Sequence, residues 1–136
     1  MNMRYFVSRI FVLVLLVLEA SPYGVVLNFM PDYGVTVKSY FSYFDLTPFG
    51  YAVFGPLIAA IFTVLLAALM IVSLFWKSTL QKKILASLSV FIPLASVSPL
   101  ALGLQYMTVI SWCVTIISVC MSVILCRDAS VSEKKE

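Results

Sequence analysis

The sequence predicts an all-α membrane protein, built as a four-helix transmembrane bundle with an aromatic-rich outer segment between spans one and two. Composition, four long apolar runs and the distribution of basic residues support this fold class. Of the 136 residues, 62% are hydrophobic and 11% are charged, whereas a soluble domain carries about 25% charged residues. So few charges cannot cover a water-facing surface, and we assign residues 1–136 to a single membrane domain.

Four runs of the chain are long and apolar enough to cross a bilayer, which takes about 20 residues for roughly 30 Å of hydrocarbon. The expected spans cover about residues 5–28, 51–76, 84–104 and 106–126. The segment of residues 127–136 is short and charged and contains Ser, and it is expected to form a disordered cytoplasmic tail.

The basic residues predict the orientation of these spans, because cytoplasmic segments retain Lys and Arg. Only Lys38 falls in the segment between spans one and two. The other eight basic residues lie before or near the start of span one, between spans two and three, or after span four: Arg4, Arg9, Lys77, Lys82, Lys83, Arg127, Lys134 and Lys135. The predicted location is the cell membrane, with several crossings and both termini in the cytoplasm.

Glu19 and Pro22 are the candidate functional residues of span one. Glu19 is the only acidic residue within the apolar stretch Ile10–Phe29, and an acidic side chain at the centre of a bilayer costs about 2.5–3.5 kcal/mol on insertion scales. A helix ending at Ala20 would place Glu19 at the outer boundary. The apolar residues after Pro22 favour instead a longer helix that kinks at Pro22 and continues to about residue 28.

In that longer helix, Glu19 is expected to face the bundle, to stay neutral, and to donate a hydrogen bond to a hydroxyl of span three or four. A rival interpretation makes residues 1–20 a cleaved signal peptide. The sequence Leu18-Glu19-Ala20 is a poor cleavage site, because the position of Leu18 should hold a small residue.

Two stripes of small or hydroxyl residues predict the helix contacts, since such residues mark close packing in lipid. The stripe of span two consists of Gly55, Ala59, Thr63 and Ala67, and that of span four of Ser111, Thr115, Ser118 and Ser122. Packing within this chain is preferred to a dimer contact. Cys113 and Cys120 lie opposite the second stripe and are expected to be buried as small apolar packers.

Span three contains Pro93, which cannot donate to the carbonyl of Ser89 and is expected to kink the helix. A kinked helix lined by hydroxyls can build a cavity, and it can also simply fit four helices together. Both interpretations stay open.

The segment Ser21–Gly50 is expected to lie along the outer interface or to cap the bundle, because Tyr favours the membrane boundary. Val37, Phe41 and Phe44 would share a helical face there. The aromatic residues suggest an interfacial belt or a patch for a partner or an apolar ligand. The principal ones are Tyr40, Phe41, Tyr43 and Phe44.

Three stretches of the first half of the chain, namely Leu18–Phe29, Tyr40–Tyr51 and Phe54-Gly55-Pro56, resemble small uncharacterised four-span membrane proteins of Gram-positive bacteria. The resemblance implies a bacterial cell membrane and no particular chemistry.

The residue types argue against an enzyme. The chain has no His, no close pair of carboxylates and no C-x-x-C. We therefore predict no catalytic site, no metal site and no cofactor. We also predict no nucleic acid partner. We predict a non-enzymatic accessory or scaffold subunit that acts by helix–helix association in the lipid bilayer, with another membrane protein or with itself. The alternative is a small proton- or cation-coupled transporter that uses Glu19.

Overall fold

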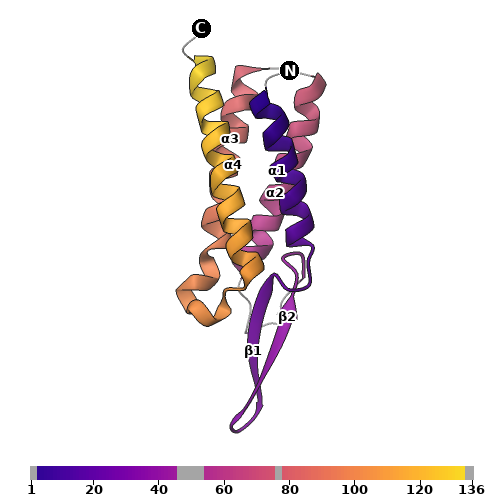
Figure 1. Ribbon diagram of the computed structural model, residues 1–136, viewed down its shortest axis with the longest axis vertical. Helices are drawn as coiled ribbons and strands as arrows, with labels where there is room; N and C mark the ends of the chain where they lie inside the picture. The colour runs from indigo at the N-terminus through magenta and orange to yellow at the C-terminus, as the bar shows by residue number, and fades with distance from the viewer. Residues whose placement is uncertain (1–2, 46–53, 76–77, 134–136) are drawn as a thin grey trace.

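Four helices lie side by side in alternating directions, and a β-hairpin projects from one end (Figure 1). The computed structural model describes residues 3–45, 54–75 and 78–133. The helices are α1 (Met3–Glu19), α2 (Phe54–Phe75), α3 (Thr79–Ser96) and α4 (Val109–Glu133), and the strands are β1 (Val25–Asp32) and β2 (Val35–Phe41). Two 3-10 turns, η1 (Ser98–Leu102) and η2 (Leu104–Tyr106), connect α3 to α4. We call the two ends of the helices the hairpin end and the terminal end, the latter because α1 begins and α4 ends there (Figure 1).

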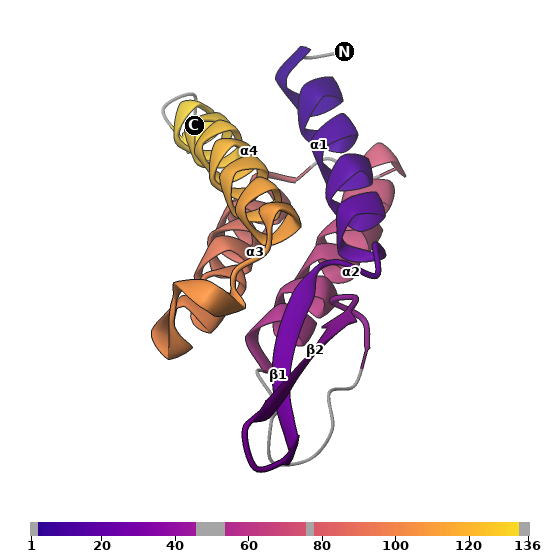
Figure 2. The same ribbon diagram turned by 60° about the horizontal axis from the view of Figure 1, so that its bottom comes forward.

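Each helix packs against two others. α1 contacts α2 and α4, and α3 contacts the same two helices. Figure 2 shows α3 and α4 side by side, with α1 and α2 beside them. The core between them is filled by fully buried aliphatic and sulfur-containing side chains, of which the largest are Leu15, Leu66, Leu85, Ile92 and Met121.

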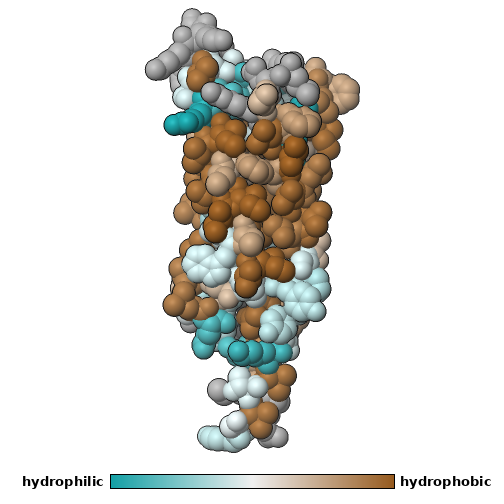
Figure 3. Space-filling model, viewed as in Figure 1, coloured by the Kyte–Doolittle hydropathy of each residue, from teal (hydrophilic) through white to brown (hydrophobic). Residues whose placement is uncertain are grey.

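Three helical segments are long and apolar enough to cross a membrane: Phe54–Phe75, Thr79–Ala101 and Val109–Ser132. Their outer surface forms a broad hydrophobic band between two more polar ends (Figure 3). α1 has 17 residues, or about 25 Å at 1.5 Å per residue, which is shorter than the other three. A fourth crossing, by α1, stays a prediction.

The predicted end of span one was wrong. α1 stops at Glu19, and the amide of Ala20 makes a last helical bond to the carbonyl of Leu16 at 3.0 Å. Pro22 therefore lies in a turn beyond the helix and kinks nothing. Pro22 has no N–H to continue the helix, and the β-branched Val25 and Val26 that follow it pair with β2 instead.

The helical face expected for Val37, Phe41 and Phe44 was also wrong, because this part of the outer segment forms the second strand of the hairpin. Val25 pairs with Phe41, and Phe29 pairs with Val37 in antiparallel register. The turn between the strands uses Gly34 at φ +87°, a conformation that a side chain disfavours. The alternation Val35-Thr36-Val37 is too short to predict a strand by itself, and the strand is formed through its pairing with β1.

Two further boundaries differ from the sequence-based spans. α3 ends at Ser96, and the chain then turns through η1 and η2 rather than staying helical to residue 104. α4 continues to Glu133, so residues 127–133 are helical and not a disordered tail. Residues 51–53, 76 and 134–136 of the expected spans and tail lie outside the described part of the chain.

Candidate functional site

Glu19, the last residue of α1, points into the interior at the hairpin end of the helices. Its side chain is fully buried. The hydroxyl of Thr63, on α2, donates to Glu19 Oε1 at 2.8 Å. The expected partner was a hydroxyl of span three or four, and that expectation was wrong. The partner comes from the small-residue stripe of α2, because α1 packs on α2 as well as on α4.

The Glu19 carboxyl is held by too few donors to be stable as an anion. The single hydroxyl hydrogen of Thr63 has two acceptors within reach, Glu19 Oε1 and the carbonyl of Ala59 at 3.0 Å. Glu19 Oε2 is buried and has no hydrogen-bond partner among the described residues. A protonated carboxyl would donate to the Thr63 oxygen and leave the Thr63 hydrogen for Ala59. Because an uncompensated buried charge is costly, this geometry favours neutral Glu19.

Tyr43 connects Glu19, at the end of α1, to α3 and α4 through hydrogen bonds. Its side chain is fully buried, and its amide donates to the main-chain carbonyl of Glu19 at 3.0 Å. Its hydroxyl lies 3.0 Å from Ser96 Oγ on α3 and donates to Ser111 Oγ on α4 at 3.1 Å. Burial raises the pKa of Tyr43, so the phenol stays protonated and continues to donate.

Gly24 supplies the main-chain acceptor of the same network. The Ser111 hydroxyl donates to the carbonyl of Gly24 at 2.7 Å, and the Thr108 hydroxyl donates to it at 3.0 Å. A Cβ atom at Gly24 would lie 2.7 Å from the ring of Tyr43. A glycine is therefore required for the chain to pass this close to the Tyr43 ring. We call Glu19, Gly24, Tyr43, Thr63, Ser96, Ser111 and Thr115 the polar plug; Thr115 belongs to it through a 3.0 Å contact with Ser96.

The rest of the hydroxyl stripe of α4 compensates for the proline of α3. Pro93 has no N–H, so the carbonyl of Ser89 lacks its helical donor. The hydroxyl of Ser122 donates to that carbonyl at 2.6 Å from across the interface. Ser118, one turn earlier, is also buried and donates to the carbonyl of Thr115 at 2.9 Å. The stripe thus serves packing between α3 and α4.

The small-residue stripe of α2 faces inward. Ala59 and Thr63 are fully buried, and Gly55 and Ala67 are half-buried. Gly55 lies so close to η1 that an added Cβ atom would come within 1.5 Å of Ser98 Oγ. The stripe therefore packs within this chain.

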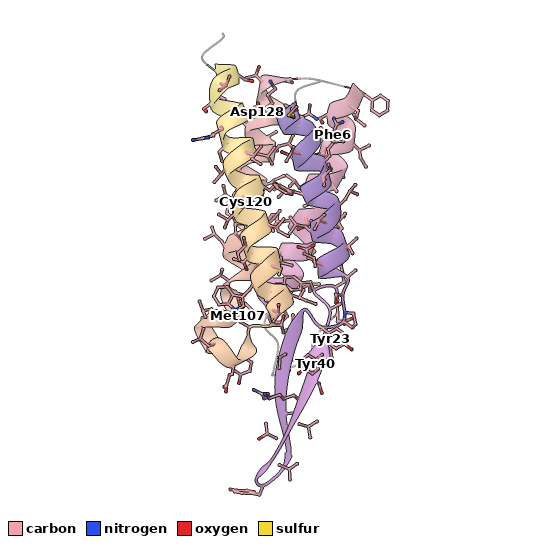
Figure 4. The ribbon with its side chains drawn as sticks, in the orientation of Figure 1. Phe6, Tyr23, Tyr40, Met107, Cys120 and Asp128 are labelled. Atoms are coloured by element: carbon pink, nitrogen blue, oxygen red, sulfur yellow. The ribbon has the colours of Figure 1, made fainter. Side chains whose placement is uncertain are left out.

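The remaining predicted residues lie outside the polar plug. Pro22, Tyr40 and Phe44 are exposed, and Phe41 is half-buried. Cys113 and Cys120 were expected to be buried and are exposed instead, as is Cys126. Figure 4 shows Cys120 on α4 in the middle of the helical region. The hydroxyl stripe takes the inward face, so the opposite face points outward.

Asp128 is a buried acidic residue that sequence reasoning missed. It lies in α4 at the terminal end (Figure 4), is 8% exposed, and accepts a hydrogen bond from the Tyr5 side chain. Lys82 lies 5.9 Å from the centre of the Tyr5 ring and donates to Ser132 Oγ at 2.6 Å. The signal was present in the spacing, since Met121, Leu125 and Asp128 follow one face of α4.

The polar plug can hold a proton and orient hydroxyls, but it pairs no nucleophile with a base. The described residues contain no group of three or more His, Cys, Asp or Glu side chains that could hold a metal ion. Fold and site together define a mostly helical protein with three helices apolar enough to cross a membrane, and with Glu19 and several serine and threonine hydroxyls buried between its helices. No family model, curated protein or solved structure matches the chain.

Proposed function

We propose that this protein is a four-span bacterial membrane protein that works as a non-enzymatic accessory or scaffold subunit, and that it binds its partner through the projecting hairpin. The single observation that carries the proposal is the hairpin tip, around the turn between β1 and β2. It extends beyond the helices (Figure 1), and the side chains of Tyr33, Val35 and Val37 are exposed there. Helix–helix association was the mode of action expected from sequence, although packing of the two stripes within this chain was preferred to a dimer contact. Most residues of both stripes are buried within the chain, so the stripes do not carry this proposal.

The exposed face of α1 supports its role as the first span. Leu13 and Val17 are 64% and 72% exposed, as suits side chains that face lipid. The contacts of Glu19 with Thr63 and with Tyr43 tie α1 to the rest of the fold, which favours a retained span over a cleaved signal peptide. Lys82 and Arg127 lie on α3 and α4 towards the terminal end, so the positive-inside rule puts that end in the cytoplasm.

The hairpin tip has the properties of a binding element. A two-stranded hairpin alone is marginally stable in water, and its open edges can accept a further strand. Tyr33, Val35 and Val37 are all at least 46% exposed. By contrast, the base is anchored, since Val25 forms a bridge to Met107. Tyr23 and Tyr40 pair at 5.7 Å near that base (Figure 4), where an interfacial belt would lie.

The orientation can be tested by cysteine labelling, because all three native cysteines lie in α4 and can be replaced. In a variant free of cysteine, Lys38→Cys should react with an impermeant maleimide on intact cells. Lys83→Cys, at the terminal end, should react only after the membrane is opened. The opposite pattern would reject the proposed topology.

The binding role can be tested by photo-crosslinking in native membranes. A photoreactive residue at Tyr33 or Val37 should give one discrete protein adduct. The control position is Ile116, which is 60% exposed on α4 and should give lipid and random neighbours. If the hairpin positions give the same products as Ile116, the scaffold proposal fails.

The unpartnered Oε2 atom of Glu19 favours the second candidate, a small proton- or cation-coupled transporter. That role requires Glu19→Gln to abolish a pH-dependent phenotype or ligand affinity. A Gln variant that behaves as wild type from mildly acidic to mildly alkaline pH rejects transport and leaves the carboxyl a packing group.

A further inference from the structure

A groove of about 180 Å³ lies between α1 and α2 on the side of the terminal end. Its floor is formed by Val12 and Met70, which are buried. Its rim is formed by Leu13, Ile71 and Leu74, which are at least half exposed, so the groove is open to the surroundings of the helices. The groove is therefore a shallow apolar channel on the surface that the proposed topology places in lipid.

Arg9 is the one polar side chain that lines this groove. Its Nε atom is buried and has no hydrogen-bond partner among the described residues. Asp128 accepts a hydrogen bond from the Tyr5 side chain. A guanidinium is always charged and has five N–H donors in a planar fork, so a guanidinium whose Nε lacks a partner, beside apolar walls, can bind an anion.

We infer that this groove binds an anionic phospholipid, with its phosphate on Arg9 and part of an acyl chain along α1 and α2. The inference goes beyond the proposed hairpin function but rests on the proposed membrane topology. Arg9 lies six residues into α1, or about 9 Å from its start. A side chain of that length reaches the headgroup level while its stem stays in the apolar region.

The positive charge of Arg9 favours an anionic lipid over a protein as the occupant of the groove. The Arg fork matches a phosphate in a bidentate arrangement. A second copy of the chain docked on the same groove by two-fold symmetry would bring a second Arg9 towards the first, which opposes association. A neutral transmembrane helix could cover the apolar walls, but it would leave the Arg9 donors buried and unpaired.

The test measures lipid binding by the full-length protein in detergent, using native mass spectrometry. The probes are phosphatidylglycerol and phosphatidylcholine with identical acyl chains. Wild type should retain phosphatidylglycerol about tenfold more tightly, as fits one charge-assisted contact. Arg9→Gln should remove this preference. The matched control is Arg127→Gln, which deletes the same charge from an exposed position on α4 and should keep it.

A second pair of variants tests the acyl channel without touching the charge. Ala67→Leu fills the groove from α2 and should weaken binding of both lipids. Ala68→Leu, one residue along on the exposed side, should not. Three results would each overturn the inference. They are equal affinity for the two lipids, equal effects of the Arg9 and Arg127 variants, and full competition by inorganic phosphate. Cysteine labelling tests the proposed topology separately. A wrong topology can therefore be distinguished from the absence of lipid binding at this groove.

Discussion

Two parts of the outer segment have similar residues and opposite environments. Tyr43, after β2, is fully buried, whereas Tyr33, at the turn of the hairpin, is fully exposed. Tyr43 has two hydroxyl partners on α3 and α4; Tyr33 projects beyond the helices. The comparison shows that hydroxyl partners inside the helices, and not aromatic character, decide which part of this segment forms the core and which part stays exposed.

The largest expected difference in stability is between variants of these two tyrosines. Tyr43→Ala should lower the free energy of unfolding by about 3–5 kcal/mol, the usual cost of deleting a large buried ring. Tyr33→Ala should cause no measurable loss, because the Tyr33 side chain is fully exposed. Thermal unfolding in detergent, followed by circular dichroism, gives both values. Tyr43→Phe should lie between them, at about 1–3 kcal/mol, because it deletes only the hydroxyl. Similar losses for the two alanine variants would contradict the comparison.

Two glycines extend the contrast to the main chain. Gly55→Ala should cost about 1–3 kcal/mol, because the new methyl would overlap Ser98 Oγ and approach the carbonyl of Ala95 within 2.5 Å. At Gly34 nothing lies within 4 Å, and the only penalty comes from φ +87°, about 1–2 kcal/mol. The two variants should also affect different parts of the structure. Strain at Gly34 should loosen the hairpin without affecting the helices. Amide exchange resolved by residue checks this, and protection lost in α2 of the Gly34 variant would argue against it.

A smaller effect tests how Pro93 is accommodated. Ser122→Ala removes the donor to the Ser89 carbonyl and should cost about 1–2 kcal/mol, the price of one buried unpaired acceptor. Ser130→Ala is the matched control, since Ser130 is exposed and bonds only within its own helix, to Arg127. Both are measured by the same thermal unfolding. If Ser122→Ala is as mild as Ser130→Ala, another donor serves the Ser89 carbonyl.

The sequence was sufficient for the long apolar helices and for the inward faces of α2 and α4, because composition and periodicity act locally. It failed where pairing depends on a distant segment. Val25 and Val26 looked like a continuation of a helix, and only their pairing with Phe41 and Tyr40 makes them a strand. The Glu19 partner was misplaced for a similar reason, since a helix that ends at residue 19 presents its last turn to Thr63. The spacing of residues along α4 could have predicted the inward position of Asp128. The charged residues around Asp128 favoured a solvated tail instead.

The smallest expected effect concerns the charge state of the polar plug, where Glu19→Gln and Lys38→Gln each remove one ionisable group. Lys38 is exposed on β2, so its loss should not change stability. Glu19→Gln should also be mild, below the net value of about 1 kcal/mol of one hydrogen bond, because the amide keeps the shape of a neutral carboxyl and can donate to Thr63. Glu19→Ala should be worse, since it opens a cavity. These values come from thermal unfolding near neutral pH. A large loss in the Gln variant would show that the native carboxyl is charged.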